Sequence, residues 1–202
     1  MKDCETKHRI METVLDLIWH SSYDSVGVGE ICTKAKVNKG SFYHFFPSKE
    51  ALAVAALEEY WQRIQPGLDQ IFSPQKNPVR RLMDYCDYGL KMQREKKAKL
   101  GFVCGCPYTT VGIEQCSQSR VIRETSEKLI DRSKKYFISA IKDAVEEGFI
   151  KPVNPLKKAH QIYTYYLGAV TQARIYNDLS MIENLKQEIM ELLEIKKGAV
   201  KV

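Results

Sequence analysis

The chain has 202 residues, of which 44% are hydrophobic, 28% charged and 10% aromatic, a composition that excludes collagen-like, low-complexity and disordered chains. Lys and Arg number 31 against 25 Asp and Glu, and this net charge of +6 permits an anionic partner without requiring one. No run approaches the roughly 18 to 20 consecutive apolar residues of a membrane-spanning helix, and the first residues lack the apolar stretch of a secretory signal. We therefore expect a cytoplasmic protein with no part in a membrane.

The first fifty residues predict one long helix followed by two short ones. Apolar residues recur at helical spacing from Ile10 to Ile18, whereas Gly27, Gly40 and Pro47 then leave room only for short helices. Ser48 is a good N-cap for a further helix.

This further helix is predicted to connect two domains. It covers residues 49–67, because Pro66-Gly67 predicts its end. It would follow a first domain of residues 1–48 and open a second domain of residues 49–202.

The second part of the chain contains several helix signals and no strand signal. Asn77-Pro78 and Asn154-Pro155 each place a capping Asn before a Pro at the first helical position, and Gly148 follows a long apolar stripe as its expected end. Ser180 with Glu183 has the spacing of a capping box. Since no alternating strand pattern occurs, we predict an all-α fold of about eight to ten helices.

Residues 28–49 have the pattern of a helix-turn-helix. Ile31 and Ala35 share one face of a short helix, and a tight turn leads to the next one, which in this motif enters the major groove of DNA. Residues 34–49 contain four lysines and no acid, although basic and acidic residues balance over the first fifty. Positive charge focused on one element is typical of phosphate neutralisation.

The order and spacing of these residues resemble the TetR-type one-component transcriptional regulators. The match runs from Arg9 to Glu50 and is most specific in the string KGSFYHFFPSKE. The resemblance implies a three-helix DNA-binding head, a helical-bundle domain for ligand binding and dimerisation, and double-stranded operator DNA as the partner. The residues predicted to contact DNA are Lys34, Lys36, Lys39, Gly40, Ser41, Tyr43, His44 and Lys49. Of these, Tyr43 and Lys49 are implied to touch phosphates, and the others on the second helix are candidates for base edges.

Two positions depart from the family pattern. Gly27 replaces the usual Thr or Ser that opens the first helix of the motif, and Lys36 replaces the usual turn glycine. The neighbouring Phe42, Phe45 and Phe46 are expected in the core, because large aromatic side chains are mostly buried.

The resemblance also implies a homodimer. In the family, the last two helices, here about residues 155–177 and 180–196, pack against their copies in a second subunit. The two DNA-binding heads of such a dimer are related by a two-fold axis, so they meet DNA half-sites roughly 34 to 36 Å apart, or a multiple of a helical turn. The residues predicted at this interface are Tyr166, Leu167, Val170, Ile182, Leu185 and Ile189.

Residues 101–119 bring three of the six cysteines close together in sequence, and we expect free thiols. Cys104, Cys106 and Cys116 lack the usual spacing of a metal site and have no histidine nearby, so no metal and no cofactor are expected. The thiols are either inert packing residues or sensors of oxidants and electrophiles, and Cys106 precedes Pro107 at a predicted helix N-terminus, where a thiolate is favoured.

A closer resemblance favours sensing. The Gly-Cys pair, the second cysteine ten residues later, and the Tyr-Leu-Gly-Ala-x-x-Gln-Ala-Arg-Ile stretch at residues 166–175 are similar to the N-ethylmaleimide-responsive repressors of the family. This similarity implies that the position of Cys106 senses electrophiles.

An ordinary ligand-binding repressor is the alternative. Tyrosines with polar tips would then line a pocket for an unknown small-molecule effector, namely Tyr85, Tyr88, Tyr108, Tyr163 and Tyr165. An enzyme is disfavoured, because the sequence contains no phosphate-binding glycine loop, no His-Glu-x-x-His and no Gly-x-Ser-x-Gly.

Overall fold

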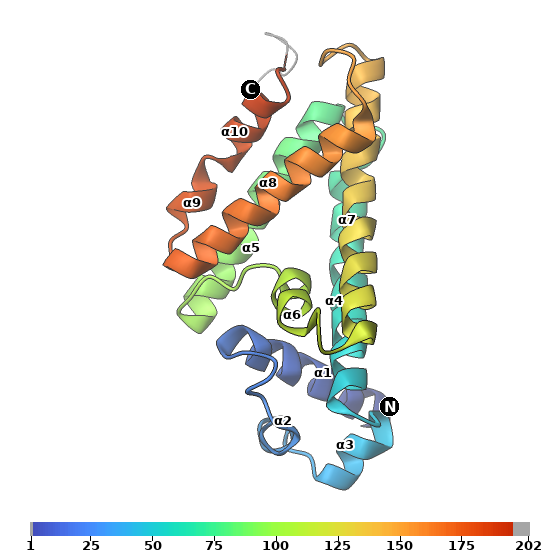
Figure 1. Cartoon of the computed structure of the whole chain (residues 1–202), viewed down its shortest axis with the longest axis vertical. Coiled ribbons are helices and arrows are strands. Elements are labelled where there is room, and N and C mark those ends of the chain that lie inside the picture. The colour runs from blue at the N-terminus through green and yellow to red at the C-terminus, as the bar shows by residue number, and fades with distance from the viewer. Residues whose placement is uncertain (1, 196–202) are drawn as a thin grey trace. The chain divides into compact units, whose positions relative to one another are not determined.

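The computed structural model describes residues 2–195, and these residues form ten helices and no strand (Figure 1). The helices are α1 (Lys2–His20), α2 (Val28–Ala35), α3 (Lys39–Phe45), α4 (Lys49–Ile71), α5 (Pro78–Leu100), α6 (Pro107–Gln115), α7 (Arg120–Glu146), α8 (Pro155–Tyr176), α9 (Ser180–Glu183) and α10 (Leu185–Leu192). The predicted all-α fold is confirmed. No helix in the described part of the chain has the length and apolar character needed to cross a bilayer.

The chain packs as two compact units. The first comprises the residues up to Ile64 together with Pro107–Ile130, and the second comprises Gln65–Cys106 and the residues from Asp131 onward. The helices α4 and α7 therefore each contribute to both units. The predicted functional boundary after residue 48 lies inside the first unit and stays a prediction.

The first unit buries one face of each of its N-terminal helices. Ile10 of α1, Ile31 of α2 and Phe42 of α3 are fully buried in its core. The Arg9 Nε donates a hydrogen bond of 2.8 Å to the carbonyl of Ala35, which fixes α1 to the end of α2. These contacts hold the predicted helix-turn-helix on α1.

The helix α4 does not end at Pro66-Gly67, and that prediction is wrong. Pro in a helix interior removes a hydrogen bond and costs about 3 kcal/mol. Beyond it, however, Leu68 and Phe72 bury their side chains in the second unit, and each such burial stabilises by about 1.5–3 kcal/mol. Packing therefore offsets the local penalty, and the helix continues to Ile71.

The predicted helix ends at Asn77, Asn154 and Gly148 in the second unit are confirmed. The Asn77 Oδ1 accepts hydrogen bonds of 3.0 and 3.1 Å from the backbone N–H groups of Val79 and Arg80 at the start of α5. The Asn154 Oδ1 accepts one of 3.0 Å from Lys157 N–H at the start of α8. Gly148 follows α7 with a φ of +76°, the left-handed conformation of a helix-ending glycine.

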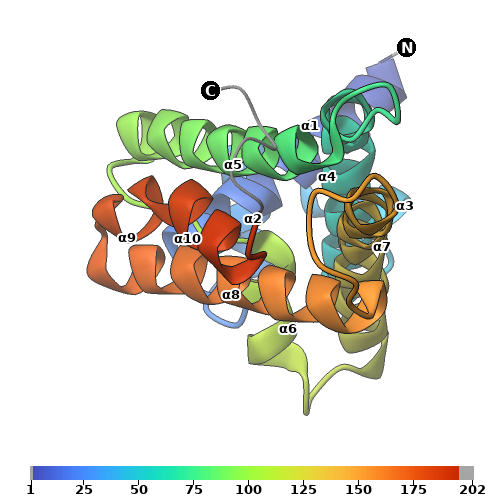
Figure 2. The ribbon, with the colours of Figure 1, turned by 90° about the horizontal axis from the view of Figure 1, so that it is seen from above.

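The end of the described chain differs from the predicted helix of residues 180–196. The Ser180 hydroxyl and backbone N–H both donate to Asp178, at 2.7 and 2.9 Å, so Ser180 does not form the predicted capping box. The helix is broken at Asn184 into α9 and α10, and residue 196 lies outside the described residues. Figure 2 shows α9 and α10 alongside α8, and α10 also packs against α5.

Candidate nucleic-acid interface and thiol site

A three-residue turn joins α2 to α3. Lys36 adopts the left-handed conformation with a φ of +52°, and its N–H bonds back to Thr33 O at 3.2 Å. The Asn38 Oδ1 then caps α3 by accepting a hydrogen bond of 2.7 Å from Ser41 N–H. Lys36 thus takes the backbone conformation that glycine adopts more easily, and the turn forms without the glycine.

The helix α3 has a buried aromatic face and an exposed polar face. Phe42 and Phe46 are buried, as predicted, whereas Phe45 is only half-buried against the ring of His44, with ring centroids 4.9 Å apart. Tyr43 is 53% exposed. Of the other residues predicted to contact DNA from this helix, Lys39, Gly40 and His44 are exposed and Ser41 is half-buried.

The predicted phosphate contact Lys49 has a structural partner. Its Nζ donates to the carbonyl oxygens of Tyr23 and Val26, at 2.9 and 3.1 Å, and lies 4.2 Å from the centroid of the Tyr23 ring. Two of its three N–H donors therefore hold the start of α4 against the loop before α2. Among the remaining predicted contacts, Lys34 is exposed and pairs with Glu30 at 3.2 Å, and Lys36 is exposed.

In the second unit, two side chains hold the loop of residues 101–106. The Gln93 Oε1 accepts 3.1 Å hydrogen bonds from the N–H groups of Cys104 and Gly105, and its Nε2 donates to Gly105 O at 3.1 Å. Arg174 of α8 donates to Cys104 O at 2.7 Å. At Gly105 the φ is +73° and an added Cβ would lie 3.1 Å from Arg174 Cδ, so the loop is tightly packed.

Cys106 ends this loop beside a cluster of tyrosines. The hydroxyls of Tyr85 and Tyr166 are hydrogen-bonded to each other, and Tyr163 is hydrogen-bonded to Ser133. Burial raises the pKa of all three phenols above the usual range, and negative charge on Cys106 raises each pKa further. The half-exposed Cys106 thiol therefore lies within electrostatic reach of three neutral hydroxyls.

The other predicted sensing cysteines have different surroundings. Cys104 is fully buried, and Cys116 is exposed in the first unit just after α6. Cys86 is buried on α5, and this burial raises the pKa of its thiol to about 12. Within the second unit, Cys106 is thus more accessible than Cys86 and Cys104.

Two family models match the chain over the parts just described. Residues 10–56 match the model of bacterial regulatory proteins of the tetR family, and residues 78–189 match that of the tetracyclin repressor-like C-terminal domain. The chain belongs to the TetR family. It is a DNA-binding transcriptional regulator, and regulators of the TetR family bind operator DNA and act as dimers.

Individual TetR-family relatives match nearly the whole chain. The HTH-type transcriptional repressor NemR of Escherichia coli is 26% identical over 195 residues, 94% of each chain, and DhaR of Mycobacterium sp. is 23% identical over 93% and 91%. The crystal structure of the reduced form of E. coli NemR has a TM-score of 0.82 and covers 97% of this chain and 100% of that one. A regulatory protein TetR from Rhodobacter sphaeroides, 24% identical, has the same fold with a TM-score of 0.81 over 92% and 97%. These relatives are named as transcriptional regulators.

Most of the residues predicted at the TetR-type dimer interface are buried within a single subunit. Five are buried within the second unit, namely Tyr166, Val170, Ile182, Leu185 and Ile189, and Leu167 is half-buried. The apolar stripe used for the prediction packs α8, α9 and α10 onto their own unit. Other apolar side chains of these helices are exposed, namely Tyr165, Ile175, Tyr176, Met181 and Leu192.

The five tyrosines predicted to line a ligand pocket do not gather around one site. Tyr85 and Tyr163 meet in the cluster beside Cys106. Tyr108 lies in the first unit with its ring centroid 5.8 Å from that of Tyr60, while Tyr165 is exposed. Tyr88 is half-buried on α5.

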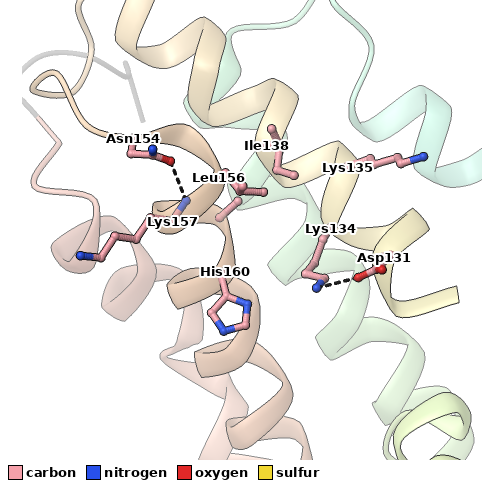
Figure 3. Close-up of a pocket in the computed structure, with 9 residues that line it drawn as sticks. Asp131, Lys134, Lys135, Ile138, Asn154, Leu156, Lys157 and His160 are labelled. Atoms are coloured by element: carbon pink, nitrogen blue, oxygen red, sulfur yellow. Dashed lines mark hydrogen bonds and ion pairs between the residues drawn. The ribbon is translucent and has the colours of Figure 1, made fainter. Parts of the chain in front are cut away.

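A surface groove of about 620 Å³ lies between α7 and α8 in the second unit (Figure 3). It is lined by Asp131, Lys134, Lys135, Ile138, Asn154, Leu156, Lys157, Ala159 and His160. The predicted tyrosines are not among these lining residues. Its apolar floor and three lysines suit an anionic ligand with an apolar part.

Proposed function

We propose that this regulator is a dimeric repressor released from its operator when an electrophile or oxidant modifies Cys106. The observation that carries the proposal is the position of this accessible thiol, at the end of a loop that Gln93 and Arg174 hold from two helices. The similarity to NemR, a repressor crystallised in a form described as reduced, supports it.

A route from the thiol to the connecting helix follows aromatic contacts within the second unit. Cys106 lies beside Tyr85, whose ring centroid is 5.7 Å from that of Phe72. Phe72 directly follows α4, and only three residues separate the start of this helix from the end of α3. Cys106 is only partly exposed, so a group added to its sulfur would press on the packed neighbours of its buried side. The resulting shift would reach α4 and change the spacing of the two recognition helices.

The wild-type protein tests the proposal directly. Fluorescence anisotropy would measure its affinity for DNA from upstream of its own gene, first reduced, then after diamide, and then after added reductant. We expect tight binding that resists competitor DNA, a loss after diamide and recovery with reductant. Equal affinity in all three states would contradict thiol sensing and direct the search to a reversible ligand, for which the groove of Figure 3 is the candidate site.

Lys39 is expected to supply part of the operator affinity. It is exposed at the start of α3, in a stretch of four lysines without an acid, so Lys39→Ala should weaken operator binding by about 1–3 kcal/mol, roughly 5- to 150-fold. Lys34→Ala is the matched control, because Lys34 already pairs with Glu30 and should change affinity less. Comparing operator with shuffled DNA separates base contacts from phosphate contacts, and unchanged operator affinity in Lys39→Ala would contradict this role.

We infer that the dimer forms through the exposed apolar side chains of α8, α9 and α10. Ile175 is 73% exposed and Tyr176 is 67% exposed at the end of α8, and large exposed apolar side chains near one another are typical of interaction sites. Ile175→Glu should give a monomer in sedimentation, and an unchanged dimer would contradict this interface.

Binding to operator DNA implies a cytoplasmic protein, and we expect no enzymatic activity.

A further inference from the structure

Three metal-ligating side chains converge on the first unit, away from the residues assigned above. His8 and Glu12 lie one turn apart on α1, and Glu59 comes from α4, 51 residues after His8. One ligand atom of each, an imidazole nitrogen and two carboxylate oxygens, lies within 4.8 Å of the others.

We propose that His8, Glu12 and Glu59 bind a divalent transition-metal ion, with Zn²⁺ as the reference. Zn²⁺ accepts imidazole nitrogen and carboxylate oxygen, and three protein ligands leave a fourth position for water. The two carboxylates carry the two negative charges that balance a divalent ion. Residues four apart on a helix face the same side, so α1 needs no rearrangement to offer two of the ligands.

The present partners of the three side chains can be exchanged for an ion. The His8 Nδ1 contacts the Glu59 carboxylate and Arg63 pairs with Glu12, so the ligand atoms already face one another. Arg63 also lies over the Tyr60 ring, 5.2 Å from the centroid, so it has a second contact besides Glu12. The His8 side chain is 56% exposed, so an ion can enter from solvent.

A bound ion would fasten α1 to α4 within the DNA-binding part of the chain. The helix α1 packs on α2, and three residues separate α3 from α4, so both ends of the helix-turn-helix would be tied together. An ion that binds only the folded protein stabilises it by mass action. At 100 times the dissociation constant, the thermal midpoint should rise by about 5 °C or more.

Calorimetric titration of the full chain with Zn²⁺ alone tests the site. The accessible thiols are replaced first, as Cys4→Ser, Cys106→Ser and Cys116→Ser, so that cysteines do not hold the ion. We expect about one ion per chain and a higher thermal midpoint, with Ni²⁺ giving the same pattern.

Two ligand variants and one control decide the assignment. His8→Gln and Glu59→Gln should each lower the affinity at least about tenfold and remove most of the thermal shift. His160→Gln replaces an exposed histidine elsewhere and should change neither. His8 is exposed and Glu59 is half-buried, so we expect His8→Gln and Glu59→Gln to fold, and circular dichroism checks this for every variant. An ion bound equally well by His8→Gln, or no binding in the serine background, would overturn the proposal.

Discussion

Replacing Cys106 with serine is expected to keep operator binding intact after N-ethylmaleimide treatment, whereas the unsubstituted protein loses at least about tenfold in affinity. Serine has nearly the same size, so the loop and the reduced-state affinity should be preserved. It has no nucleophilic thiolate, so the maleimide ring cannot add to it. The measurement is anisotropy with operator DNA before and after treatment.

The expected size of the effect follows from the packing around the thiol. The neighbouring backbone of Cys104 and Gly105 is held by three hydrogen bonds of 3.1 Å to Gln93 and by one of 2.7 Å from Arg174. A maleimide adduct is larger than the side chain that it modifies, and Cys106 is only partly exposed, so we expect the adduct to disturb these contacts and the tyrosine cluster. Overpacking of this kind costs about 1–3 kcal/mol, and a ligand-linked change of that size shifts affinity by 5- to 150-fold.

Other cysteines provide the controls for this prediction. Cys4→Ser and Cys116→Ser remove exposed thiols of the first unit and should leave the response to N-ethylmaleimide unchanged. Diamide converts two thiols to a disulfide while it is itself reduced, so a diamide response that needs Cys106 and one further cysteine would identify the pair. Full loss of affinity in Cys106→Ser after N-ethylmaleimide would contradict the assignment.

The sequence predicted several local features, although not the capping box at Ser180. Asn77 and Asn154 cap α5 and α8 as expected, because a cap depends only on residues within one turn. Phe42 was likewise expected in the core as a large aromatic side chain, and it is buried. Such features need no knowledge of what lies across the core.

Features that depend on tertiary contacts were predicted poorly. The stripe containing Ile182 and Ile189 shows that α9 and α10 bury one face, but the pattern is the same whether α5 or a second subunit covers it. The fold also gives Lys49 two partners that its charge does not reveal, the carbonyl oxygens of Tyr23 and Val26, and its contact with a phosphate stays a prediction.

The residues that position the thiol loop were missed altogether. Gln93 continues the apolar face of Met83, Cys86 and Leu90 on α5, and a polar residue at an apolar position was the available signal. Its partners are backbone groups of the loop that follows, which no periodicity identifies. Glu59 was missed for a related reason, since it joins His8 only through the packing of α1 on α4.

Arg81→Ala is expected to cost about 3–5 kcal/mol of the free energy of unfolding. Arg81 is 1% exposed, and its guanidinium donates to Lys76 O at 2.9 Å, to Pro74 O at 2.8 Å and to the Asp143 carboxylate. It therefore joins the loop before α5 to α7. Truncation leaves the carbonyl oxygens of Lys76 and Pro74 without this donor and Asp143 without its counter-charge, in addition to a cavity.

The adjacent arginine provides the control for this measurement. Arg80 pairs with Asp84 at 2.8 Å on the surface of α5, and Arg80→Ala should cost no more than about 0.5 kcal/mol, because exposed pairs four residues apart are weak. Urea unfolding of both variants makes the comparison. Arg81→Lys should recover only part of the loss, since one ammonium cannot reach three acceptors in different directions. Equal costs for Arg80→Ala and Arg81→Ala would mean that the Arg81 contacts contribute no more than a surface ion pair.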